Sequence, residues 1–186
     1  MSQTMSGADV VSFLNRQHQE VKTLFGELEG AYGEARADMF QCLVRMLAVH
    51  ETAEEEVIYP VVRKVAGNGE QLASARLTEE AKAKQDLAEL ERLGVDNPQF
   101  LEKLTTLRDA VMRHAESEER EIFPVLKQHV DAKKLEMLRM ALETAEKMAP
   151  THPHPHGPES AAGNLVVGPF VAIADRLRDA LKKHAS

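Results

Sequence analysis

The stretch HETAEEEVIYPVV at residues 50–62 occurs a second time in this chain, as HAESEEREIFPVL at residues 114–126. Aligned from the histidine, six of the thirteen positions are identical. Each copy places a glutamate four residues after a histidine, which pairs His50 with Glu54 and His114 with Glu118. Four residues are about one turn of an α-helix, so the two side chains of a pair share one helix face. Two such pairs on two helices can enclose a pair of metal ions.

The composition is typical of a helical protein that binds cations rather than nucleic acid. The 186 residues are enough for one full domain with a buried core, and only 4% of them are aromatic. Leu, Ala, Glu, Lys and Arg are abundant, which favours an all-α fold. The formal net charge of −7 argues against nucleic acid as the main partner, because phosphate binding needs a basic face.

Three absences in the sequence predict a cytoplasmic protein. Cys42 is the single cysteine, which excludes an intramolecular disulfide and suits a reducing compartment. The first ten residues are polar and lack the apolar centre of a signal peptide. Because no run of 18 or more apolar residues occurs, we expect no membrane span.

Apolar residues recur at helical spacing in four long segments, which we expect to form helices over about 8–30, 35–65, 70–93 and 98–129. Short loops separate these segments, and this pattern predicts an up-down-up-down four-helix bundle. Pro60 and Pro124 each remove a backbone hydrogen bond, at a cost of about 3 kcal/mol, and should bend or break their helices just beyond the motif. The inward stripes are predicted to continue on regular spacing, through Val57, Ile58 and Val61 in the second helix and through Ile122 and Val125 in the fourth.

The chain divides into a bundle over residues 1–130 and three further segments. A fifth helix is expected over about 131–148. Residues 149–164 are rich in proline and histidine, which predicts an exposed, extended linker. Residues 165–186 have the spacing of an amphipathic helix, which we expect to pack on the bundle, on a partner protein or in a dimer.

Histidine and glutamate side chains interrupt the apolar stripes of the predicted bundle. His18 lies on the stripe of the first helix, and each motif contributes its His and Glu to the stripes of the second and fourth. A buried glutamate without a partner is very costly, so these positions imply protonation, pairing or a metal. On the third helix, whose leucines 72, 77, 87 and 90 are expected to face inward, Glu80 is the predicted ligand and Glu79 is its alternative. The predicted metal ligands are His18, His50, Glu54, Glu80, His114 and Glu118.

These residues resemble those of the hemerythrin-like family of HHE cation-binding proteins, over about residues 8–130. The resemblance implies a four-helix bundle that holds two non-haem iron ions joined by an oxo or hydroxo bridge. By position, Glu54 and Glu118 would bridge the ions, and the three histidines would be terminal ligands. Family members usually place histidine on the third helix, and here we infer that Glu80 substitutes for it. Glu51 is a further candidate, by analogy with relatives that use a carboxylate directly after this histidine.

The resemblance implies a protein that reacts with or senses dioxygen, peroxide or nitric oxide. A carboxylate-rich site stabilises Fe(III), so we expect such reactivity rather than reversible oxygen carriage. Whether the protein is an enzyme stays open, because no separate nucleophile or general base is visible, and Tyr59 is expected to be a core or cavity-wall residue. The alternatives are a non-catalytic, iron-responsive interaction protein that signals through its C-terminal helix, and a zinc-filled structural bundle.

Overall fold

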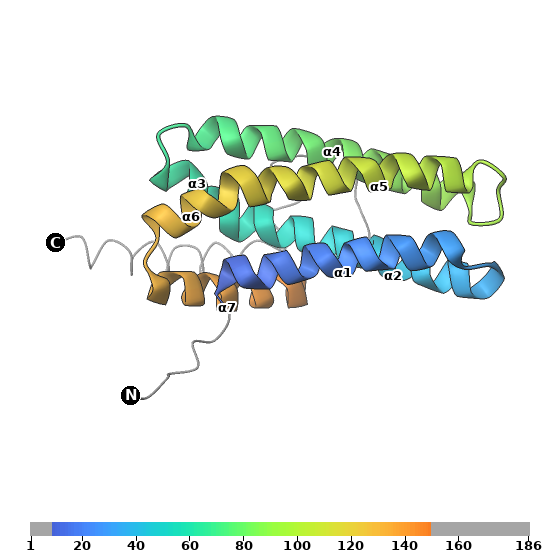
Figure 1. The fold of residues 1–186 in the computed structure, drawn as a ribbon, viewed down its shortest axis with the longest axis horizontal. Helices are drawn as coiled ribbons and strands as arrows, with labels where there is room; N and C mark the ends of the chain where they lie inside the picture. The colour runs from blue at the N-terminus through green and yellow to red at the C-terminus, as the bar shows by residue number, and fades with distance from the viewer. Residues whose placement is uncertain (1–8, 150–186) are drawn as a thin grey trace. The chain divides into compact units, whose positions relative to one another are not determined.

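The computed structural model describes residues 9–149 as a bundle of helices, shown in Figure 1. Two short segments, η1 and η2, are π-helical and join the α-helices on either side into continuous helical runs. All five predicted helices are therefore present, each within two residues of its expected ends. The predicted linker beyond residue 149 and the predicted helix 165–186 lie outside the described residues. The elements are α1 (Val10–Gly30), α2 (Gly33–Ala53), η1 (Glu54–Ile58), α3 (Tyr59–Val65), α4 (Gly69–Leu93), α5 (Phe100–Ser117), η2 (Glu118–Ile122), α6 (Phe123–His129) and α7 (Ala132–Met148).

The four long helical runs alternate in direction, which confirms the predicted all-α bundle. In Figure 1, α1 and α4 run one way along the bundle, while the runs α2–η1–α3 and α5–η2–α6 return the other way. The fifth helix, α7, contacts α1, α2 and η1 along the outside of the four-helix core. None of the helices described between residues 9 and 149 is long and apolar enough to span a membrane.

Local signals in the sequence set several helix ends. Asp9 caps α1 by accepting a hydrogen bond from the Ser12 amide at 2.7 Å, and Asp131 caps α7 in the same way. Gly94 ends α4 with φ of +78°, a backbone conformation that favours glycine. At the start of α4, a side chain at Gly69 would lie 2.2 Å from the Val62 carbonyl oxygen, so glycine permits the close approach of α4 to α3.

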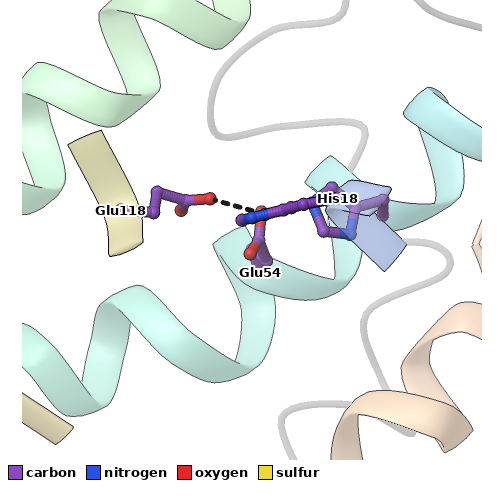
Figure 2. Close-up of side chains that lie close together, drawn as sticks. His18, Glu54 and Glu118 are labelled. Atoms are coloured by element: carbon purple, nitrogen blue, oxygen red, sulfur yellow. Dashed lines mark ion pairs between the residues drawn. The ribbon is translucent and has the colours of Figure 1, made fainter. Parts of the chain in front are cut away.

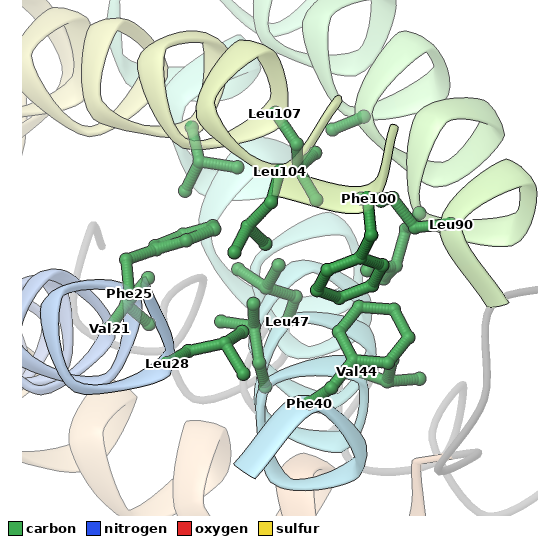
Figure 3. Close-up of a cluster of buried hydrophobic side chains, with 14 residues drawn as sticks. Val21, Phe25, Leu28, Phe40, Val44, Leu47, Leu90, Phe100, Leu104 and Leu107 are labelled. Carbon is green, nitrogen blue, oxygen red and sulfur yellow. The ribbon is translucent and has the colours of Figure 1, made fainter. Parts of the chain in front are cut away.

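An apolar cluster fills the half of the bundle nearest the α1–α2 and α4–α5 loops. Its side chains come from residues 21–28 of α1, 40–47 of α2, 83–90 of α4 and 100–111 of α5, as Figure 3 shows. Phe40 and Phe100, which belong to this cluster, meet edge to face with ring centroids 5.1 Å apart. The predicted ligands lie one or two helical turns beyond this cluster, on the side away from these loops. The apolar cluster therefore closes one end of the site.

Candidate metal centre

The two copies of the motif have the same backbone geometry, including a π-helical turn that begins at each motif glutamate. The amide of Tyr59 donates to the Glu54 carbonyl, and the amide of Phe123 donates to the Glu118 carbonyl, both five residues back. Pro60 and Pro124 follow directly, and a wider turn relieves the steric conflict that a proline creates within a regular helix. Of the expected bend or break, the break does not occur, because each helical run continues through a π-turn just before its proline.

The π-turns also move the buried stripe by one residue in both copies. Val61 and Val125 were predicted to face the core, but each is only half-buried. The next residues, Val62 and Leu126, are fully buried instead. A π-turn accommodates one extra residue relative to an α-helix, so the regular spacing used to place the stripe fails beyond each glutamate.

All six predicted ligands are buried and converge between the helices. Figure 2 shows the Glu118 carboxylate directed toward the His18 ring, with which it pairs, and the Glu54 side chain beside that ring. The candidate ligand atoms form two groups, and within each group one atom per residue lies within 4.8 Å of every other. Because Glu54 belongs to both groups, its carboxylate can serve two ions. The first group is His18, His50, Glu54 and Glu118, and the second is Glu54, Glu80 and His114.

The three histidines direct the same ring nitrogen into the site. His50 Nε2 lies 3.2 Å from Glu54 Oε2, and the Nε2 atoms of His18 and His114 lie 3.4 Å and 3.6 Å from Glu118 Oε2. The Nε2 atoms of His18 and His114 have no hydrogen-bond partner, and neither do three carboxylate oxygens of Glu54 and Glu80. Buried polar atoms without partners are rare, so an arrangement that collects them from several helices fits bound cations.

The opposite ring nitrogen of each histidine is held by an oxygen acceptor. His18 Nδ1 lies 2.9 Å from Glu119 Oε1, and His114 Nδ1 lies 2.9 Å from Glu79 Oε2. His50 Nδ1 lies 3.1 Å from the side-chain oxygen of Gln17. Such contacts place the proton on Nδ1 and leave the Nε2 lone pair for a metal, as is usual for ligating histidines.

Helix α4, which is the third long helix of the prediction, carries both Glu79 and Glu80, and the structure places Glu80 as the inward residue. Glu80 is 1% exposed and lies in the second ligand group, whereas Glu79 is half-buried, belongs to neither group and meets His114 at the outer Nδ1 atom. Of the leucines expected inward on this helix, Leu72 and Leu77 are only half-buried, while Leu87 and Leu90 are buried. Metal ligation by Glu80 remains a prediction.

Glu51 is buried beside the site but lies in neither ligand group. Lys84 Nζ lies 3.9 Å from Glu51 Oε2 and 4.0 Å from Glu80 Oε2, and it pairs closely with Glu55. Burial alone would lower the pKa of Lys84, but these three carboxylates outweigh it and raise the pKa. Lys84 is therefore a positively charged side chain at this edge of the cluster, and Glu51 can pair with it instead of with a metal ion.

Two functional contacts escaped the sequence reasoning. The Tyr59 hydroxyl, fully buried, contacts both Glu80 and Glu118, at 2.9 Å in the second case. In an α-helix the residue five positions after Glu54 would point about 140° away, and the π-turn brings it back. Arg76 is 6% exposed and donates to Glu79 at 2.8 Å, which fixes the carboxylate behind His114. The sequence signal for Arg76 was its position one helical turn before Glu80, which places it on the same inward face of α4.

The carboxylates of the cluster cannot all be ionised without a cation. Burial, followed by the charge of Glu118, raises the pKa of Glu54 well above its usual range, and burial with Glu51 does the same for Glu80. Burial alone would also raise the pKa of Glu118, but the His18 and His114 rings outweigh it and lower the pKa to about 2. Bound cations would take the place of the protons on Glu54 and Glu80.

A cavity of about 20 Å³ lies between this cluster and the apolar core, enough for one water-sized molecule. His50, His114, Glu51 and Glu80 line it on the polar side. Val21, Leu47, Ala83 and Val111 line it on the apolar side. A small molecule held there would contact both ligand groups and an apolar wall.

Comparisons with known proteins agree with this architecture. An uncharacterised hemerythrin-like protein of Schizosaccharomyces pombe is 27% identical over 170 residues, covering 90% of this chain and 84% of the relative. A DNA nickase of Nostoc sp. is 27% identical over 145 residues, covering 77% of this chain but only 40% of the relative. The crystal structure of a hemerythrin HHE cation-binding domain-containing protein from Mycobacterium kansasii superposes with a TM-score of 0.67 at 20% identity, over 76% of this chain and 86% of the other.

The last of these likenesses concerns the fold alone. The model of the hemerythrin HHE cation-binding domain, however, matches residues 9–126, from the first turn of α1 through most of α6. This range includes all six residues that converge on the cluster. The chain therefore belongs to the hemerythrin HHE cation-binding family.

Proposed function

We propose that this protein holds two iron ions and reacts with or senses dioxygen, peroxide or nitric oxide. The observation that carries the proposal is the pair of ligand groups sharing Glu54. Three imidazoles and three carboxylates supply mixed nitrogen and oxygen donors, which suit iron or manganese on a helical bundle. Bound iron would supply the redox chemistry with the small ligand.

The chain's own residues would bind the ions, orient the ligands and exclude water. Glu54 would be shared between the two ions, and Glu118 lies within 3.6 Å of imidazoles on both sides. The apolar wall of the cavity favours a small uncharged molecule over a large polar substrate. The buried Tyr59 hydroxyl lies against two of the carboxylates and would donate a hydrogen bond to them.

Two features bear on where the protein works and what it contacts. The lone Cys42 is exposed and unpaired, as suits a reducing cytoplasm, which we propose as its location. The match to the Nostoc DNA nickase covers only 40% of that protein, and the net charge of −7 does not favour nucleic acid as a partner of this chain. The iron-responsive interaction protein depends on residues 165–186, which lie outside the described part.

Elemental analysis of aerobically purified protein, with its absorption spectrum before and after peroxide, tests the proposal. We expect about two irons per chain, with visible absorption that changes on peroxide addition, and loss of iron in His50→Ala and His114→Ala. His129→Ala is the matched control, because this histidine is exposed at the end of α6. Full iron content in both site variants, or zinc with no visible absorption, would contradict the proposal, and the second result would favour the structural zinc bundle.

A further inference from the structure

Helix α7 reaches the candidate metal centre through one side chain of α1. Glu146 of α7 accepts a hydrogen bond from the Gln17 amide nitrogen at 2.6 Å. The oxygen of the same Gln17 amide lies 3.1 Å from His50 Nδ1. A chain of two hydrogen bonds thus links Glu146 to a predicted ligand, across the contact of α7 with α1 in Figure 1.

The chemistry of Glu146 sets the direction of both hydrogen bonds. An amide can present either its NH₂ group or its oxygen to a neighbour, so Gln17 alone does not decide which nitrogen of His50 carries the proton. An ionised carboxylate only accepts, so Glu146 draws the NH₂ group of Gln17 toward itself. The oxygen of Gln17 then faces His50, whose Nδ1 must donate, and the Nε2 lone pair is left toward Glu54.

His50 differs in this respect from the other two histidines of the cluster. His18 and His114 each meet a carboxylate directly, from Glu119 and Glu79 respectively. A directly bonded carboxylate fixes the ring tautomer by itself. At His50 Nδ1 the partner is the neutral amide of Gln17. The carboxylate that orients this amide belongs to Glu146 on α7, which does not contact His50 directly.

We propose that Glu146 is a positioning residue of the metal centre, acting through Gln17 on His50. The inference rests on the proposed function, since it concerns a metal bound by His50. It assigns α7, which begins after the residues 9–126 matched by the family model, a part in supporting the site. Removal of a group that supports a ligating histidine typically weakens metal binding by about 10- to 100-fold.

Zinc alone is a suitable probe, because its release to a colorimetric chelator can be timed without redox chemistry. We expect Glu146→Ala to release zinc at least roughly tenfold faster than the unaltered chain. Glu146→Gln keeps the size of the side chain, so its release rate should increase less. Glu143→Ala is the matched control, because Glu143 is also half-buried on α7 but pairs with Arg139 of the same helix. Its release rate should match that of the unaltered chain.

A double variant separates this role from a packing role of α7. If Glu146 acts through Gln17, the variant Gln17→Leu/Glu146→Ala should release zinc no faster than Gln17→Leu alone. Three results would overturn the role of Glu146 while leaving the metal site intact. They are an unchanged zinc-release rate in both Glu146 variants, an equal acceleration by Glu143→Ala, and a double variant in which the two single effects multiply. Failure of the unaltered chain to retain zinc or iron would overturn the proposed function together with it.

Discussion

The Tyr59 hydroxyl donates to the Glu118 carboxylate at 2.9 Å, so the first copy of the repeated motif contacts the glutamate that the second copy offers as a predicted ligand. The contact has no counterpart in the other direction, because Phe123 occupies the matching position and its ring stacks on His18 instead, with centroids 5.6 Å apart. Two copies of one motif therefore build an asymmetric cluster. The difference lies in one oxygen atom.

Replacing Tyr59 with phenylalanine should lower the stability of the metal-free protein without changing its fold. Phe123 shows that a phenylalanine fits at the end of the same backbone motif. The lost hydrogen bond to a buried carboxylate should cost about 1.5–3 kcal/mol, measured by urea unfolding. Tyr32→Phe is the control, since Tyr32 is the other tyrosine and is 78% exposed. Equal stability of the two variants would show that the Tyr59 hydroxyl contributes nothing.

Alanine at Glu80 and alanine at Glu79 should affect metal binding differently, although the two residues are neighbours. Glu80→Ala removes a predicted ligand from the second group, so the metal content should fall from two ions toward one. Glu79→Ala removes the acceptor behind His114 together with a partner of Arg76, but no predicted ligand, so two ions should still bind, at roughly 10- to 100-fold weaker affinity. Elemental analysis and metal titration of both variants measure this. The assignment of Glu80 fails if its variant keeps two ions.

The metal-free protein should lose stability as the pH rises above about 6.5. Burial raises the pKa of Glu51 to about 7 and holds those of Glu54 and Glu80 well above their usual range, so the folded chain keeps protons that the unfolded chain releases. Stability from a raised pKa is complete below the unfolded value and is lost as the pH passes the folded value. Each such proton changes the unfolding free energy by up to about 1.4 kcal/mol per pH unit.

His50 has the opposite effect on stability at lower pH, so the pH range of the measurement must lie above the range in which His50 titrates. Burial and the neighbouring His18 lower the pKa of His50 to about 3, so His50 reduces stability as the pH falls below its ordinary value of 6.5. Urea unfolding between about pH 6.5 and 8, with a chelator present, avoids that effect. The metal-loaded protein should not show the decline, because cations replace the protons. Glu51→Gln should make the metal-free slope shallower, and an unchanged slope would contradict the role given to Glu51.

Gly69→Ala should destabilise the junction between α3 and α4. The added methyl group would lie 2.2 Å from the Val62 carbonyl oxygen and 2.7 Å from the Arg63 α-carbon, both rigid backbone atoms. Overpacking of this kind costs about 1–3 kcal/mol, which chemical denaturation can measure. Gly67→Ala provides the comparison, because nothing lies within 4 Å of an added methyl group there. Similar stabilities for the two variants would refute the close approach.

The sequence allowed the helices and the inward histidines to be predicted because both depend on regular α-helical spacing. His18, His50 and Glu54 all lie in or at the end of α-helical segments, where a count of three or four residues returns to the same face. Tyr59 could not be placed in this way, because it follows a π-turn. The contact between Gln17 and Glu146 was also inaccessible, since it spans 129 residues and no periodicity relates the two.

The π-turns at Glu54–Ile58 and Glu118–Ile122 also determine where this family member can change in length. Deleting one residue within either turn would remove the residue that distinguishes the π-turn from a regular α-helical turn. The same deletion would rotate every following residue by about 100°, which would turn Tyr59 away from Glu80 and Glu118, or Phe123 away from His18. Loops between the helices tolerate gain or loss of residues, whereas these two turns keep a fixed count, and an alignment of relatives should show gaps in the former and none in the latter.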